Sequence, residues 1–138
     1  IKLKWGQNKY VHSIKDTLNI DNKKDNITYI LRGIKYNNNY VGVFLLCLNK
    51  IPLSYTSKNY RPGALLSRMI IDKKYQRLGI GKTVTLKIIN YVKKLGYDKL
   101  YITCVQGTNS PIHFLKKKGF KKTGRKLWNE EEELVLQI

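Results

Sequence analysis

The residues with the clearest chemical potential are Gly79 and Gly81, which lie in the run Gln76–Gly81. An apolar segment typical of a buried strand precedes the run at 64–71, and apolar side chains with helical spacing follow it at 84–95. Glycines at a helix entrance let backbone N–H groups converge on an anion, and the positive end of the helix dipole adds to the attraction. The run therefore predicts a site for a diphosphate; a plain turn between strand and helix is the alternative.

Two better-known phosphate-binding motifs fit the same run poorly. A P-loop also ends in Gly-Lys-Thr, as residues 81–83 do, but it needs an earlier glycine at a spacing where this chain has none. A dinucleotide-binding fingerprint needs a third glycine where Val84 stands, and it usually opens its fold instead of lying in the middle. The sequence disfavours both motifs.

A second segment, Asn109–Phe120, has the punctuation of a short helix. Ser110 can cap the helix, Pro111 suits its first position, and Gly119 can end it in the left-handed conformation. The intervening segment at 99–105 is apolar on both faces, as expected of a central strand that pairs in parallel with the strand at 64–71.

In order and spacing these segments resemble the GNAT N-acetyltransferase superfamily. The run Ser67–Gly81 is similar to motif A, whose signature is Arg or Gln, two residues, Gly, one residue, and Gly or Ala, and Asn109–Phe120 is similar to motif B, a helix that ends in Gly-Phe. The resemblance extends over residues 1–138 and is closest to bacterial polyamine and other small-molecule acetyltransferases. It implies a cytoplasmic acyltransferase with acetyl-CoA as co-substrate.

The fold that the resemblance implies is α/β (α+β), in one domain over residues 1–138. A mixed sheet of about six or seven strands, flanked by about three or four helices, would be splayed into a V between the strands at 64–71 and 99–105. Acetyl-CoA would lie in this V. The resemblance implies that the pantetheine arm is held by Met69, Ile70 and Ile71. It places the diphosphate on Gln76, Arg77, Leu78, Gly79, Ile80, Gly81 and Lys82. The thioester arm would be flanked by Asn109, Pro111, Phe114 and Lys117.

The reaction would be direct attack of an acceptor amine on the thioester. The amine must lose a proton, and the departing thiolate benefits from a proton donor. Many relatives supply that donor from a tyrosine at the position of Leu115, and a base from an acidic residue on the first strand of the V, where Ser67 is the nearest polar side chain. If a donor is lacking, replacing Leu115 by tyrosine should raise turnover.

Several residues could replace the missing groups. Ser67 and His113 are the candidate catalytic residues, and Tyr75, Tyr101 and His12 are further possibilities. Catalysis by positioning with a water chain is the remaining option, since holding an amine against a thioester itself lowers the barrier.

The charge is extreme, with 27 basic and 9 acidic residues and a net charge of +18. Such a surface attracts polyanions, although the lysines are spread along the chain and can serve solvation alone. A polycationic acceptor would be repelled unless Glu130–Glu133 formed a local acidic pocket. We expect the acceptor to be an amine of a small molecule or a protein. One alternative is toxin-like acetylation of aminoacyl-tRNA on a basic face (Lys116, Lys117, Lys118, Lys121, Lys122, Arg125 and Lys126); another is an acetyl-CoA-binding module without turnover.

The rest of the chain supplies supporting elements. We expect a strand at 1–5, a helix at 8–19, a hairpin that turns at Asn37–Asn39, a mobile loop over 49–63, and closing strands at 120–128 and 133–138. The chain has no apolar run of membrane-spanning length. Cys47 and Cys104 should be reduced core residues, and no metal site is expected. The protein should be a monomer or a homodimer.

Overall fold

The computed structural model describes residues 27–52, 60–104, 111–127 and 131–138. The expected strand at 1–5 and helix at 8–19 lie outside the described residues, as do His12, Asn109 and Ser110. Glu130 of the possible acidic pocket also lies outside them, and the remaining candidate site residues fall within the described ranges.

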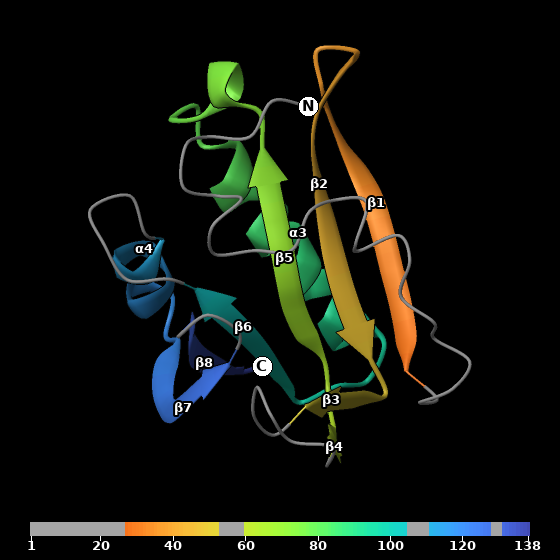
Figure 1. Cartoon of the computed structure of the whole chain (residues 1–138), viewed down its shortest axis with the longest axis vertical. Coiled ribbons are helices and arrows are strands. Elements are labelled where there is room, and N and C mark those ends of the chain that lie inside the picture. Colours follow the sequence, from red (N-terminus) through yellow and green to blue (C-terminus); the bar gives the residue numbers. More distant parts are fainter. Residues whose placement is uncertain (1–26, 53–59, 105–110, 128–130) are drawn as a thin grey trace.

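A mixed six-stranded sheet organises the described chain, with strand order β1-β2-β5-β6-β8-β7 (Figure 1). A separate pair, β3 with β4, lies at one end of it. Only β5 and β6 pair in parallel, and every other pair is antiparallel. The strands are β1 Thr28–Tyr36, β2 Asn39–Leu48, β3 Lys50–Pro52, β4 Tyr60–Pro62, β5 Leu65–Ile71, β6 Lys99–Cys104, β7 Lys121–Leu127 and β8 Glu131–Gln137.

The β1–β2 hairpin confirms the turn expected at the asparagines. Asn37 and Asn38 have φ values of 49° and 66°, and Tyr36 pairs with Asn39 across the turn. Two consecutive left-handed residues match the twist of a two-residue hairpin, and Asn tolerates that conformation better than most side chains. The hairpin carries β2 alongside β5 and so supports one arm of the sheet.

The sheet opens between β5 and β6, as the V required. The two strands pair only at Leu65 with Tyr101 and Leu66 with Ile102. Beyond these pairs β5 continues to Ile71 beside β2, while β6 turns away beside β8 (Figure 1). Within the described residues, the later part of β5 therefore has a strand partner on one edge alone.

A β-bulge lies where β5 leaves β6. Leu45 of β2 pairs with Arg68, but the next residue, Leu46, pairs with Leu66, so Ser67 is the extra residue of β5. A bulge bends its strand and increases the local twist. The bulge at Ser67 thus gives a physical reason for the divergence of the two strands at this point.

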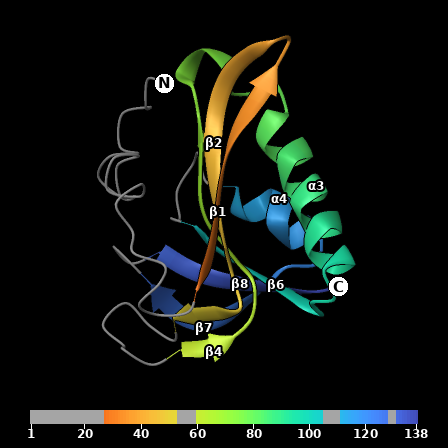
Figure 2. The same ribbon diagram turned by 90° about the vertical axis from the view of Figure 1, so that its right-hand side faces the viewer.

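The described chain holds two α-helices, α3 Ile80–Lys94 and α4 Ile112–Lys117, and a 3-10 turn, η1 Lys73–Tyr75. The expected number of three to four helices is therefore not matched there, because the predicted helix at 8–19 lies outside the described residues. Both helices pack on one face of the sheet (Figure 2). Along the described residues, no helix is long and apolar enough to cross a membrane.

Each face of the sheet carries its own buried cluster. On the face of α3 and α4 the cluster includes Leu46, Leu66, Ile88 and Leu115. The opposite face, here called the second face, buries Leu45, Cys47, Ile51 and Leu65. Cys47 and Cys104 are both buried thiols, as expected of core residues, and burial raises the pKa of Cys47 to about 12.

The loop expected over 49–63 contains regular structure at both ends. Residues 50–52 and 60–62 form the antiparallel pair β3–β4, and residues 53–59 lie outside the described residues. The prediction of an irregular loop was wrong for these strands because Ile51 is fully buried in the cluster of the second face. The two prolines stand at strand ends, where proline is tolerated.

Replacing Gly42 by alanine should destabilise the protein by about 1–3 kcal/mol. A Cβ at Gly42 would lie against the backbone carbonyl oxygen of Ile70, closer than Cβ atoms come in proteins, and would push β2 from β5. Chemical denaturation measures the loss. Gly33→Ala is the matched control, because its Cβ would come close to the ring of Tyr40, which can move, and would meet the backbone oxygen of Gly42 at an ordinary 3.9 Å. Equal stability of the two variants would contradict the close approach of β2 and β5.

Candidate functional site

The turn between β5 and α3 is held in an unusual backbone conformation. Arg77 and Gly79 both have positive φ values, of 68° and 78°. The side-chain amide of Gln76 donates to the backbone oxygen of Ile71 at 2.8 Å, which ties the start of the turn to the end of β5. A left-handed arginine is uncommon and is kept only where its surroundings fix it. The turn is therefore a fixed feature of the backbone.

The start of α3 leaves its amides available. Gly79 is the N-cap residue and provides no side-chain cap, and the first hydrogen bond of the helix runs from Thr83 N to Gly79 O at 3.0 Å. The N–H groups of Ile80, Gly81 and Lys82 consequently lack intrahelical partners, as in any first helical turn. No acidic residue in this turn competes for them. The arrangement suits an anion.

Space around the two glycines is open. Among the described residues, a Cβ at Gly79 would meet nothing within 4 Å, and one at Gly81 would meet only Met69 Sδ, at 3.8 Å. The glycines therefore do not serve tight internal packing. Their missing side chains leave the amides of the turn accessible, so the residues present fit a bound diphosphate.

The structure brings the second motif to this turn. Lys82 Nζ lies 5.4 Å from the ring centroid of Phe114 on α4, and Lys118 Nζ lies 5.9 Å from the same centroid. Pro111 is the N-cap of α4, and both it and Lys117 are exposed. Phe114 thus connects α4 to Lys82 at the start of α3 and has a lysine from each helix end near its ring.

The predicted pantetheine segment runs along the open part of β5. Met69, Ile70 and Ile71 pair with β2 on one edge, and within the described residues no strand pairs with their other edge. Ile70 is buried, whereas Met69 and Ile71 are partly exposed. A free strand edge can receive an extended ligand as if it were another strand.

The two candidate catalytic residues lie in different settings. Ser67 is buried in the bulge, where its hydroxyl accepts a hydrogen bond from Arg68 Nη1 at 2.9 Å, and Arg68 Nη1 also donates to Ser67 O at 3.0 Å. His113 is exposed on α4. Ser67 therefore holds the bulge together with Arg68. Catalytic roles for Ser67 and His113 stay predictions.

A hydroxyl donor introduced at Leu115 would not point into the proposed site, because this side chain lies in the core. Its side chain is 2% exposed and packs in the core between α4 and the sheet. A tyrosine there would be buried among apolar groups, so we expect a stability loss, and the rise in turnover stays a prediction. Leu115→Tyr should destabilise the protein by about 1–3 kcal/mol in thermal or chemical unfolding, whereas Lys116→Tyr, at an exposed neighbour, should not. Higher turnover with unchanged stability would contradict this placement.

The second face holds buried charged residues, and the sequence indicated the glutamates among them as a possible acidic pocket but did not indicate the arginine. Arg68, Glu131 and Glu133 are all buried. Burial raises the pKa of Glu131 to about 7, and the charge of Arg68 opposes the rise. Burial also lowers the pKa of Arg68, against the opposing effect of Glu131. The run of four glutamates was the available signal, because alternate residues of a strand share a face.

The four glutamates separate as a strand requires. Glu131 and Glu133 are buried on the second face, whereas Glu132 pairs with Lys122 at 3.1 Å. Glu130 lies outside the described residues. Two of the four are thus buried on one face, and an acidic pocket formed by Glu130–Glu133 stays a prediction. In the described part of the chain, no group of three His, Cys, Asp or Glu residues could hold a metal ion.

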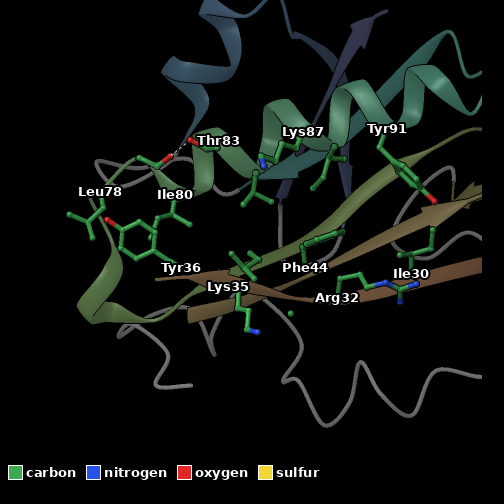
Figure 3. A pocket seen from close by; sticks show the side chains of 15 residues that line it. Ile30, Arg32, Lys35, Tyr36, Phe44, Leu78, Ile80, Thr83, Lys87 and Tyr91 are labelled. Atoms are coloured by element: carbon green, nitrogen blue, oxygen red, sulfur yellow. Dashed lines mark hydrogen bonds between the residues drawn. The ribbon is translucent and has the colours of Figure 1, made fainter. Parts of the chain in front are cut away.

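A groove of about 700 Å³ lies on the other face, between β1 and α3 (Figure 3). Figure 3 shows Arg32 and Lys35 on the strand side, Lys87 and Tyr91 on the helix side, and Leu78 at the end near the glycine turn. Of the described residues that line the groove, none is acidic. A cationic amine would therefore not be favoured there.

The sequence matches one protein family. A family model described as "Acetyltransferase (GNAT) family" matches residues 2–120. Among curated proteins, none matches the sequence.

Solved structures share the fold at low identity. A GNAT family acetyltransferase from Elizabethkingia anophelis with acetyl-CoA bound has a TM-score of 0.59 and 22% identity, over 80% of this chain and 76% of that one. The PaiA N-acetyltransferase from Thermoplasma acidophilum in complex with coenzyme A has a TM-score of 0.59 and 21% identity, over 85% of this chain and 65% of that one, so the chain spans less than two thirds of its length. A mutant AtaT toxin bound to the C-terminus of the antitoxin AtaR has a TM-score of 0.56 and 19% identity, over 79% of this chain and 66% of that one.

Proposed function

The chain belongs to the GNAT acetyltransferase family, and from this membership we propose that it transfers the acetyl group of acetyl-CoA to a primary amine. The family uses acetyl-CoA as co-substrate, and structural relatives were solved with acetyl-CoA or coenzyme A bound. The acceptor is an amine of a small molecule or a protein.

The observation that carries the proposal is the uncapped start of α3 beside the open edge of β5. Gly79 provides no side-chain cap, and a Cβ at Gly79 or Gly81 would meet almost nothing. Amides with a helix dipole behind them bind a diphosphate without rearrangement. The free edge of β5 then receives the pantetheine arm, which directs the thioester toward the bulge at Ser67.

This chain's residues would contribute positioning and electrostatics. Lys82 lies close to Phe114, so its charge is held near the expected phosphates. A backbone N–H of β5 near Ile70 or Ile71 would stabilise the charge that develops on the thioester oxygen. The acceptor nitrogen would attack the thioester carbon after losing its proton, with sulfur as the leaving atom.

Calorimetric titration with acetyl-CoA and a thiol-release assay over a panel of primary amines test this function. We expect saturable binding of acetyl-CoA, and thiol release that depends on both the amine and the protein. Binding without thiol release on any amine would instead identify an acetyl-CoA-binding module. Absence of binding would contradict the proposal altogether.

A second candidate, acetylation of aminoacyl-tRNA, is favoured by one observation. The basic residues of α4, the following turn and β7 are all exposed: Lys116, Lys117, Lys118, Lys121, Lys122, Arg125 and Lys126. Such a face can neutralise several phosphates, which makes binding steeply dependent on salt. Thiol release with charged tRNA, and with none of the small amines, would favour this candidate.

A further inference from the structure

The buried acids of β8 have unequal partners. Glu133 Oε2 accepts from Arg61 Nη2 at 2.6 Å, and Glu133 Oε1 accepts from the Thr123 hydroxyl at 2.9 Å. Glu131 is 3% exposed, yet its Oε2 has no hydrogen-bond partner among the described residues. A buried carboxylate oxygen without a partner is costly, so Glu131 is poorly explained by stability alone. Hydrogen bonds to both carboxyl oxygens thus explain the burial of Glu133.

Glu131 lies at the opening of the V. It is the first residue of β8, directly before Glu132, which pairs with Cys104 at the end of β6. Arg68 belongs to the other arm of the V, where it follows the bulge in β5. Alternation places Glu131 with Glu133 on the second face, and Arg68 pairs with Leu45 of that same face. The carboxyl and the guanidinium thus belong to the two arms that the open sheet separates.

Glu131 holds its proton more tightly than an exposed glutamate does, because it is buried. Burial raises its pKa to about 7, and Arg68 of β5 limits the rise. Arg61 of β4 is engaged by Glu133, and the pKa of the Cys47 thiol on β2 is raised to about 12, so that thiol stays neutral. A group with this proton affinity can exchange a proton with its surroundings at neutral pH.

We propose that Glu131 binds the acceptor as an ammonium ion at the second face and takes its proton before the attack. This proposal rests on the proposed acetyl transfer. The ammonium N–H bond breaks and its proton moves to the Glu131 carboxylate, which leaves a neutral amine. The nitrogen lone pair forms the N–C bond to the thioester carbon, the C–S bond breaks with its electrons on sulfur, and the second amine proton goes to the thiolate. Glu131 then releases its proton to water.

The same geometry assigns a substrate class, a primary alkylamine that presents one ammonium group to the second face. A protein at +18 repels a polycation at long range, so one buried carboxylate favours an acceptor whose positive charge is concentrated at the reacting nitrogen. The groove between β1 and α3 contrasts with this face, since no described residue of its lining is acidic.

The test uses the full chain with acetyl-CoA and follows thiol release from pH 5.5 to 9.5. It compares n-butylamine, a monocation of the favoured class, with the dication 1,4-diaminobutane, which should be the poorer acceptor. For the native protein, kcat/KM should rise up to about pH 7 and then level off, because the enzyme uses the ammonium form. Glu131→Gln should lower kcat/KM about 100-fold at pH 7.5. Its remaining activity should rise about tenfold per pH unit through pH 9, because it must use the scarce neutral amine. Glu132→Gln, a neighbour on the opposite face, should stay within about twofold of the native protein.

A second readout does not depend on turnover. Carbon-13 NMR of glutamate-labelled protein should contain one carboxyl resonance that titrates near pH 7 and is missing in Glu131→Gln. Saturating n-butylamine should lower that midpoint, because a bound cation favours the carboxylate. If the native protein is active and Glu131→Gln has the same rate and pH profile, the role of Glu131 is overturned and the proposed acetyl transfer is not. A native protein that binds acetyl-CoA but acetylates no amine would overturn the proposed transfer and this role together.

Discussion

Replacing Gly81 by glutamate should weaken acetyl-CoA binding by at least about 100-fold, which corresponds to about 2.8 kcal/mol. The new carboxylate would stand among the N–H groups at the start of α3, repel the diphosphate and occupy its place. The fold should survive, because the backbone at Gly81 does not have positive φ and its Cβ would meet only Met69 Sδ at 3.8 Å. Replacing a glycine raises helix propensity, and an acidic side chain is stabilising in the first turn of a helix, so neither effect should unfold the variant.

Calorimetric titration of native protein, Gly81→Glu and Gly81→Ala separates charge and bulk from the loss of glycine itself. Gly81→Ala should bind within a few-fold of the native protein, since the family signature accepts alanine at this position. Circular dichroism and thermal unfolding check that each variant is folded. A folded Gly81→Glu variant with native affinity would remove the turn from the cofactor site.

Replacing Arg68 by methionine should destabilise the protein by about 2–3 kcal/mol at pH 8 but by only about 1 kcal/mol at pH 5. The smaller effect reflects the hydrogen bonds from Arg68 Nη1 to Ser67, which are lost at any pH. The larger effect adds the loss of the charge that opposes the raised pKa of Glu131. Removing Arg68 therefore makes ionisation of the buried Glu131 carboxyl more costly, and at pH 8 the folded protein must bear that cost or take up a proton.

The sign of the pH dependence follows from the direction of the pKa shift. The folded protein holds the Glu131 proton more tightly than the unfolded chain, because the pKa rises from 4.5 to about 7 on folding. This contribution to stability is fully present below the unfolded pKa and is lost as the pH rises through the folded pKa. Without Arg68 the folded pKa rises further, so the loss continues to higher pH.

Urea denaturation at pH 5 and pH 8 measures this difference, with Arg68→Lys as the matched control. The lysine keeps the positive charge, so its pH dependence should stay close to that of the native protein. If Arg68→Met lost the same free energy of unfolding at both pH values, the electrostatic link between Arg68 and Glu131 would be refuted.

Local sequence signals predicted the elements that position the cofactor. The asparagine pair specified the hairpin, and the glycines at 79 and 81 specified an open helix start, because in both places the backbone conformation depends on the side chain of the residue itself. The parallel pairing and divergence of β5 and β6 followed from the resemblance and are present in the structure.

Features that depend on distant contacts were missed. Ile51 forms strand structure because it is buried on the second face, although the prolines and serines around it indicate a loop. Leu115 matches the family's tyrosine position in sequence, but packing against the sheet turns its side chain into the core.

The acceptor side of the site was also beyond local patterns. Four consecutive glutamates do not reveal which of them is buried, since that depends on the register of β8 against β6 and β7. The cation whose charge acts on Glu131 is Arg68, on a strand far away in sequence, and only the fold brings the two charges to one face.

The most direct test of the account is an amide NMR titration of nitrogen-15-labelled protein with coenzyme A. We expect the largest downfield shifts at the backbone N–H resonances of Gly79, Ile80, Gly81 and Lys82, because these groups donate to the diphosphate. The same resonances should stay in place in Gly81→Glu. Saturable binding that shifts other amides and leaves these four unmoved would contradict the central claim.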